Sequence, residues 1–271
     1  MKKIFLVLLA AAAAFTVSAQ YKAPLIVANG GFHQHASSGV KNSMSALKAA
    51  QKAKVYGSEC DINITQDGKI LVIKPGWHPS RKSKPRASVN KSTAKKILAI
   101  PYTTGERVST LEEFLARAAK KPATKLILDI SNQSTTRRET NIVKKVVNIV
   151  KEAGMENQVE YIAGHPWTCF ELVKYSPNSK IYYWGGNYDP LYVKGMGCHG
   201  IDYSLSVLKK NKSWIAMAHK LGMPVNVWVV DREIDIRWCI QNGVDIITTN
   251  KPLLVKNVIK DMCPKSKKKK R

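Results

Sequence analysis

Residues 57–75 read GSECDINITQDGKILVIKP, which is an apolar strand, an Asp-Gly turn and a second apolar strand. Residues two apart on a strand point to the same face, so the pattern predicts that Glu59 and Asp61 project together. Two carboxylates this close repel each other unless a proton or a cation lies between them. In a chain with a formal net charge of +25, a divalent cation held by oxygen ligands is the expected occupant.

The turn is too short for a parallel crossover, so strand 70–73 must run antiparallel to strand 58–64. Elsewhere, short apolar runs alternate with helical patterns. Barrel strands are predicted at 25–28, 58–64, 125–130, 159–163, 181–184, 201–203, 225–230 and 246–248. Helices are predicted near 43–54, 139–153, 168–175, 214–221, 233–241 and 253–260, with a further one starting at Ser109 or Thr110. The pattern indicates an α/β fold, a (β/α)8 TIM barrel with a β-hairpin excursion after the second strand, whose active site lies where the strands end.

Residues 1–19 have the pattern of a signal peptide. Lys2 and Lys3 precede an apolar run over 4–15, and small residues at 17–19 offer a cleavage site. We therefore expect export to the periplasm or the cell exterior, a barrel domain over 20–262 and a basic, disordered tail over 263–271. The five cysteines are scattered, which predicts neither a disulfide framework nor a zinc site.

The excess positive charge is concentrated in two places. Seven basic residues lie in the segment 81–96, which has no acidic residue, and six more lie in the tail. Solvated, disordered segments are one interpretation, and attraction to an anionic membrane or lipopolysaccharide surface is the other. No motif that reads DNA or RNA accompanies the charge, so nucleic acid is not an expected partner. The oligomeric state does not follow from the sequence.

One residue and two segments can be considered together with residues 57–73. Asn42 precedes the first predicted helix, VNVWVV spans residues 225–230 and GVDIITTNKP spans residues 243–252. In this order the segments resemble the glycerophosphodiester phosphodiesterases, enzymes of lipid metabolism. The resemblance implies a glycerophosphodiester or other phosphodiester ligand, a divalent cation (Ca²⁺ or Mg²⁺) held by Glu59, Asp61 and Asp129, and two histidines that act as general acid and base.

The chain departs from that family at the residues that transfer protons. Asn29-Gly30 stands at the first His-Arg, Lys74 at the second histidine, and Lys41 at a glutamate before Asn42. Each lost acid/base group is worth roughly 10²–10⁴ in rate. We therefore expect the protein to bind a phosphodiester or phospholipid head group with hydrolysis weak or absent. Lys41 and Lys74 would weaken metal binding and favour a bound phosphate.

Two other functions remain open at this point. His33, His35 and His78 lie near the substituted positions and would make an active, metal-dependent hydrolase if they replaced the missing pair; packing against Phe32 and Trp77 is the alternative. The protein would instead be an anionic-surface-binding protein if the basic segments are its active feature.

The remaining candidate residues are aromatic or lie near the barrel mouth. His165 would contact ligand there, unless Pro166 simply starts the next helix. The resemblance places Trp228 in the substrate pocket. Tyr182, Tyr183 and Trp184 are expected to serve packing, with only one face of this strand able to reach the mouth.

Overall fold

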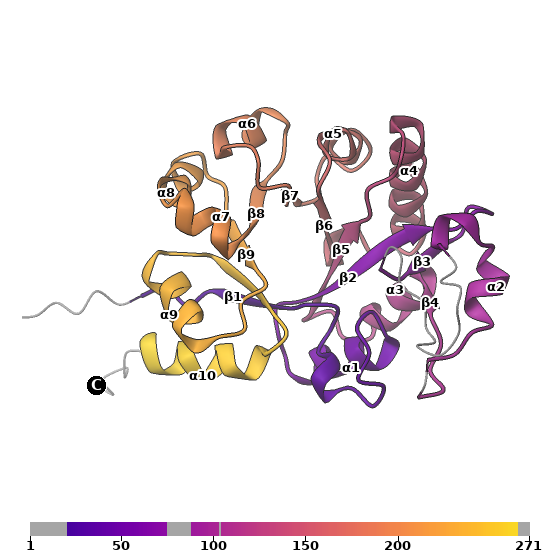
Figure 1. The fold of residues 1–271 in the computed structure, drawn as a ribbon, viewed down its shortest axis with the longest axis horizontal. Coiled ribbons are helices and arrows are strands. Elements are labelled where there is room, and N and C mark those ends of the chain that lie inside the picture. Colours follow the sequence, from indigo (N-terminus) through magenta and orange to yellow (C-terminus); the bar gives the residue numbers. More distant parts are fainter. Residues whose placement is uncertain (1–20, 75–87, 103, 265–271) are drawn as a thin grey trace, which may run out of the picture.

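The structure is a computed structural model that describes residues 21–74, 88–102 and 104–264 (Figure 1). The predicted signal peptide, His78, the basic segment up to residue 87 and the tail from residue 265 onward lie outside the described residues. None of the helices within the described ranges is long and apolar enough to cross a membrane.

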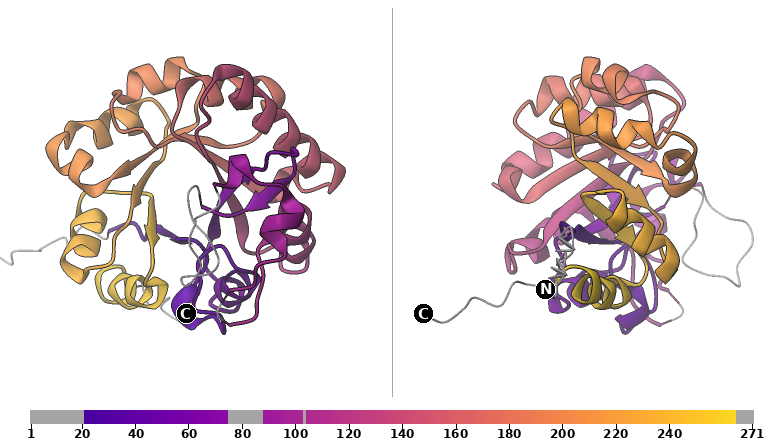
Figure 2. Two further views of the ribbon diagram at one scale, coloured as in Figure 1. Left: turned by 45° about the vertical axis from the view of Figure 1, so that its right-hand side comes forward. Right: turned by 90° about the vertical axis from the view of Figure 1, so that its left-hand side faces the viewer.

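Eight parallel strands of the described chain form a closed barrel, which confirms the predicted fold. Around the ring they are β1 (Leu25–Ala28), β2 (Gly57–Ile64), β5 (Lys125–Ile130), β6 (Val159–Ala163), β7 (Ile181–Tyr183), β8 (Gly200–Ser204), β9 (Val225–Trp228) and β10 (Ile246–Thr249). Pairing of β1 with both β10 and β2 closes the ring. Figure 2 shows the helices around the outside of the strands.

The predicted hairpin excursion leaves the barrel after β2. The strand β3 (Ile70–Val72) runs antiparallel to β2, and β4 (Ser109–Thr110) adds to β3. In the turn, Gly68 adopts a φ of 78°, which favours glycine, and the Thr65 hydroxyl donates to Asp67 Oδ1 at 2.6 Å. The return strand leads to Lys74. Ile73 N donates to Asp61 O at 2.9 Å, and this bond holds the end of the return strand beside β2.

Helices connect the strands and cover the barrel. They are α1 (Met44–Lys52), α2 (Ala94–Leu98), α3 (Leu111–Ala119), α4 (Thr136–Glu152), α5 (Pro166–Tyr175), α6 (Pro190–Gly195), α7 (Leu205–Lys210), α8 (Ser213–Lys220), α9 (Glu233–Gln241) and α10 (Pro252–Met262). The start of α3 agrees with the prediction, since Thr110 and Glu113 form a capping box there. Pro166 is the first residue of α5, in agreement with its interpretation as a helix start.

Apolar side chains fill the amino-terminal end of the barrel interior. Val27, Ile127, Ile162, Tyr182 and Ile246 form this buried cluster. Side chains alternate along a strand, so residues two positions further along the same strands face the interior one layer closer to the carboxyl end. The apolar cluster therefore lies beneath the residues that face the carboxyl end of the barrel, and Ile162 forms part of the floor of the cavity there. All five cysteines are free, and four of them are buried.

Candidate active site

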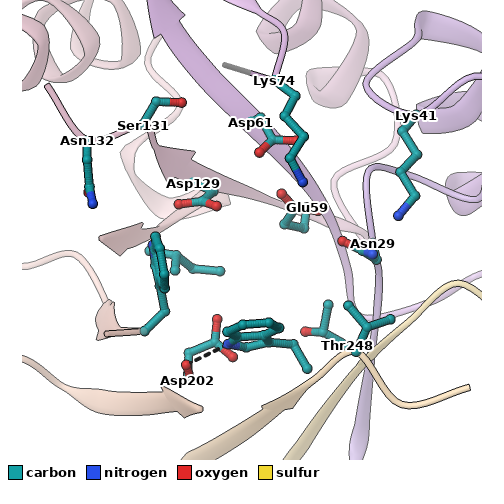
Figure 3. Close-up of a pocket in the computed structure, with 14 residues that line it drawn as sticks. Asn29, Lys41, Glu59, Asp61, Lys74, Asp129, Ser131, Asn132, Asp202 and Thr248 are labelled. Atoms are coloured by element: carbon teal, nitrogen blue, oxygen red, sulfur yellow. Dashed lines mark hydrogen bonds between the residues drawn. The ribbon is translucent and has the colours of Figure 1, made fainter. Parts of the chain in front are cut away.

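A cavity of about 520 Å³ opens at the carboxyl ends of the barrel strands (Figure 3). Its described lining consists of Asn29, Lys41, Glu59, Asp61, Lys74, Asp129, Ser131, Asn132, Ile162, Trp184, Asp202, Trp228, Val229 and Thr248. Acidic and basic side chains occupy one wall, and two tryptophans occupy the opposite wall.

Three carboxylates form the centre of the charged wall. Glu59 and Asp61 project from β2, and Asp129 lies directly beside Asp61 on the parallel strand β5. One oxygen from each of the three carboxylates lies within 4.8 Å of the others. The structure therefore brings together all three residues that were predicted as metal ligands.

The cluster is unfavourable without a compensating charge. Burial raises the pKa of Glu59 well above its ordinary range, and the charges of Asp61 and Asp129 add to this rise. Burial, followed by the charge of Asp61, raises the pKa of Asp129 to about 7. The Gly30 amide, which donates to Glu59 Oε2 at 2.5 Å, and the Lys41 ammonium partly oppose the rise at Glu59. A bound cation would relieve the remaining repulsion, so the residues fit a divalent metal.

Asn42 holds Asp61 in place and does not itself line the cavity. Its Nδ2 donates to Asp61 Oδ2 at 2.7 Å, and its Oδ1 accepts from Asp61 N at 3.0 Å. The backbone of Asn42 has a φ of 61°, a left-handed conformation that asparagine tolerates better than most residues. Asn42 is thus a positioning residue for the acidic cluster.

The Asn29 amide lies between Glu59, Lys41 and Asn250. In one orientation its nitrogen donates to Asn250 Oδ1 at 3.1 Å. With the amide turned over, the nitrogen donates to Glu59 Oε2 at 3.1 Å and the oxygen accepts from Lys41 Nζ at 2.8 Å. The second orientation satisfies two charged partners, so Asn29 links the acidic cluster to Lys41.

Lys41 and Lys74 bring two ammonium groups to the charged wall, where Figure 3 shows both side chains directed into the cavity. Burial lowers the pKa of Lys41; the charge of Glu59 opposes this change, whereas the nearby charge of Lys74 adds to it. Two cations that repel each other across a cavity would both be stabilised by an anion placed between them.

The opposite wall contains a residue that was not predicted from the sequence. Asp202 on β8 lines the cavity, and burial followed by the charge of Asp129 raises its pKa well above its ordinary range. Trp228 Nε1 donates to the backbone oxygen of Asp202 at 2.8 Å. The buried Asp202 Oδ1 has no hydrogen-bond partner in the described part of the chain. The available sequence signal was the position of Asp202 as a single acidic residue between the apolar residues Ile201 and Tyr203.

Two tryptophans add apolar surface to the wall that contains Asp202. Trp184 and Trp228 meet edge to face, with ring centroids 6.2 Å apart and an interplanar angle of 85°. Trp228 lines the cavity, and its predicted contact with a substrate stays a prediction. Trp184, which was expected to serve mainly packing, also lines the cavity.

The predicted histidines His33, His35 and His165 do not line this cavity. His35 packs on Phe32 at a centroid distance of 4.3 Å, and His33 is half-buried, with a pKa lowered by burial and by the charge of Lys41. His165 caps α5, accepting from Trp167 N at 3.3 Å. Of the described residues, no histidine lines the cavity. His78 lies outside the described residues.

The fold and the site define this protein as a TIM barrel with three clustered carboxylates and two lysines at its mouth. The sequence matches the glycerophosphoryl diester phosphodiesterase family over residues 29–254, and the chain belongs to this family. Members of this family are metal-dependent and bind glycerophosphodiester ligands, and Glu59, Asp61 and Asp129 form a candidate acidic metal cluster.

Individual relatives agree with this assignment. A glycerophosphodiester phosphodiesterase from Caldanaerobacter subterraneus subsp. tengcongensis is 25% identical over 231 residues, which covers 81% of this chain and 92% of the relative. The crystal structure of a glycerophosphodiester phosphodiesterase from Parabacteroides distasonis has a TM-score of 0.83 and 26% identity, covering 89% of this chain and 98% of the other. A phosphodiesterase from Oleispira antarctica, solved with its product sn-glycerol-3-phosphate, shares the fold with a TM-score of 0.74 at 14% identity, over 87% of this chain and 96% of the other.

Proposed function

We propose that this protein is an exported phosphodiester-binding member of its family, with hydrolysis weak or absent. The expected ligand is a glycerophosphodiester or a phospholipid head group. The observation that carries the proposal is the charged wall of the cavity, where Asn29, Lys41 and Lys74 face the carboxylates and no described histidine does. The pattern of residues 1–19 supports export.

In this proposal the phosphate lies between the Lys41 and Lys74 ammonium groups. A charge-assisted hydrogen bond to phosphate is stronger than a neutral one, and two opposed donors fix the position of the anion. The alcohol portion would lie against Trp184 and Trp228. A divalent cation held by Glu59, Asp61 and Asp129 would neutralise phosphate charge, although the two lysines weaken its binding by repulsion.

The proton-transfer groups of the cavity explain why hydrolysis should be slow. An amide such as Asn29 has no proton to transfer near neutral pH. Lysine as a residue type releases its proton near pH 10, whereas histidine does so near pH 6.5. A general acid or base must also lie within hydrogen-bond reach of the reacting group, and the half-buried His33 and the stacked His35 do not line the cavity.

Calorimetric titration with sn-glycerol-3-phosphate tests the binding part of the proposal. Lys41→Met and Lys74→Met should each lower the affinity roughly 10- to 100-fold, because each removes a charged hydrogen bond worth about 1.5–3 kcal/mol. Lys48→Met, which removes an exposed lysine of α1, is the matched control and should leave the affinity unchanged. Equal affinities in all four proteins would contradict the proposed phosphate position.

A further inference from the structure

Exposed apolar side chains are unevenly distributed over this barrel. Of the nine large hydrophobic residues that are exposed in the described chain, only Tyr21 and Leu25 lie at the amino-terminal end of the strands. The other seven follow barrel strands at the carboxyl end and are Trp167, Phe170, Leu191, Tyr192, Val229, Ile234 and Leu253. Single exposed hydrophobics are ordinary, but their concentration around one opening requires an explanation.

Four of the seven occupy the same position in four different helices. Trp167, Leu191, Ile234 and Leu253 are each the second residue of their helix, in α5, α6, α9 and α10 (Figure 1). Each of these helices begins just beyond the carboxyl end of a barrel strand. The Cα–Cβ bonds of a helix tilt toward its amino terminus, so exposed side chains in the first turn lean toward the mouth of the barrel.

These residues remain accessible to solvent. The exposed fraction is 62% for Leu191 and 71% for Ile234, and Val229, which also lines the cavity, is 39% exposed. We call these seven exposed residues the apolar arc. Two acidic residues beside it are engaged locally: Glu233 pairs with Arg237 at 2.9 Å, and Asp189 accepts from Tyr192 N at 2.9 Å. The arc therefore presents apolar surface beside the cavity.

Basic residues also lie at the mouth. Lys41 and Lys74 line the cavity, Arg137 is the exposed second residue of α4, and the exposed Lys251 precedes α10. An apolar arc beside basic side chains matches the two layers of a membrane interface, where acyl chains lie beneath anionic phosphates.

We infer that the mouth of the barrel docks on an anionic phospholipid bilayer. Leu191, Ile234 and Leu253 enter the interface, the basic residues contact lipid phosphates, and a head group reaches the cavity without leaving the membrane. The entry of the head group rests on the proposed function, because it requires a phosphodiester-binding cavity. The docking itself rests on the arrangement of the rim.

Vesicle co-sedimentation of the full mature chain tests this inference. The probes are phosphatidylcholine vesicles with and without phosphatidylglycerol. The variant Leu191→Ser/Ile234→Ser/Leu253→Ser should partition at least about 100-fold more weakly onto the anionic vesicles. Each apolar side chain that is partly buried in the bilayer should contribute a factor of roughly five to the partition coefficient. Leu25→Ser, which removes an exposed leucine at the opposite end of the barrel, should partition as the wild type does.

A second measurement guards against a folding effect of the triple variant. A polarity-sensitive fluorophore on Ile234→Cys should shift to the blue when vesicles are added, whereas the same fluorophore on Leu25→Cys should not; both are made in a Cys263→Ser background. Partitioning of the triple variant at the wild-type level, or binding by the wild type that high salt abolishes completely, would overturn the inference. Titration with sn-glycerol-3-phosphate separates the two proposals, since the triple variant should retain full affinity for this soluble ligand.

Discussion

The position of the Lys41 side chain at the edge of the cavity depends on the absence of a side chain at Gly30. A Cβ atom on Gly30 would lie 2.7 Å from Lys41 Cβ, so only glycine leaves the room that the lysine side chain uses. Gly30 also has a φ of 65°, a left-handed conformation. The glycine that follows Asn29 therefore leaves space for the Lys41 side chain at the cavity.

This dependence gives a residue-scale prediction with an internal control. Gly30→Ala should lower the affinity for sn-glycerol-3-phosphate about tenfold by displacing Lys41, and should destabilise the fold by more than about 1 kcal/mol. Gly39→Ala introduces similar backbone strain, at a φ of 62°, but its Cβ would meet nothing within 4 Å. It should destabilise the protein modestly and leave affinity unchanged. Equal affinity losses in both variants would show that Lys41 is not the cause.

Asp129 gives a prediction for pH dependence. Its ordinary pKa is 3.8 and the fold raises it to about 7, so between these values the folded state binds a proton that the unfolded state does not. The free energy of unfolding should therefore fall as pH rises through this window and level off above it, by a few kcal/mol at most. Denaturant unfolding in EDTA, from pH 4 to pH 8, measures this. Asp129→Asn should flatten the curve, and an unchanged slope in this variant would contradict the assigned pKa.

The acidic cluster could be predicted from the sequence, whereas the opposite wall could not. Glu59 and Asp61 share a face by strand alternation, and the resemblance supplied Asp129. A lone Asp202 in an apolar run carries no comparable pattern, because its importance comes from burial. Whether His33 and His35 could reach the cavity depends on the path of the loop before α1, where left-handed residues such as Asn42 set a course that the sequence does not specify.

At the scale of elements, Glu106 joins the hairpin excursion to α1. Its Oε1 accepts from Ser45 N at 2.8 Å, and its Oε2 accepts from the Ser45 hydroxyl at 2.6 Å. The first amides of a helix lack partners within the helix and carry partial positive charge, so this carboxylate stabilises the start of α1. The loop that holds Lys41 and Asn42 ends at this point.

Removal of the Glu106 carboxylate should loosen that junction. Glu106→Ala should lower the free energy of unfolding by about 1–3 kcal/mol, the cost of losing charged hydrogen bonds, and Glu106→Gln by less. Glu112→Ala, which removes an exposed acid from the first turn of α3, is the control and should cost much less. Chemical denaturation measures the free energy of unfolding of all three variants. Similar decreases for Glu106→Ala and Glu112→Ala would contradict a specific stabilising role of Glu106 at the start of α1.

The bounds of several strands and helices were predicted closely, whereas the shortest helices were not predicted. The strands β1, β5 and β6 and the helix α9 have the predicted bounds, because apolar alternation or helical periodicity continues to each end. The helices α6 and α7 have six residues each, fewer than two turns, and give no readable period. The helix α5 begins two residues before its predicted start because Pro166 favours the first helical position.

In the whole molecule, the apolar cluster that stabilises the barrel and the charged residues that line the cavity lie in different layers of the barrel interior. The apolar cluster around Tyr182 closes one end of the interior, and the titratable residues of the cavity are confined to the other. In the inferred docking, the apolar side chains and basic residues around the same mouth would extend the binding face beyond the cavity. The chain has the fold of its family, and in the proposed function Lys41 and Lys74 bind an anion without transferring a proton to it.

Phosphorus NMR of a glycerophosphodiester mixed with the purified protein, in the presence of Ca²⁺ or Mg²⁺, tests whether the cavity binds the diester without hydrolysing it. We expect the diester resonance to broaden in a manner that depends on Lys41 and Lys74, while the sn-glycerol-3-phosphate signal does not grow measurably. Asn29→His/Lys74→His should generate that product at least about 100-fold faster than the wild type, since each restored acid/base group is worth roughly 10²–10⁴. Steady production of sn-glycerol-3-phosphate by the wild type, abolished by Glu59→Ala, would contradict the account.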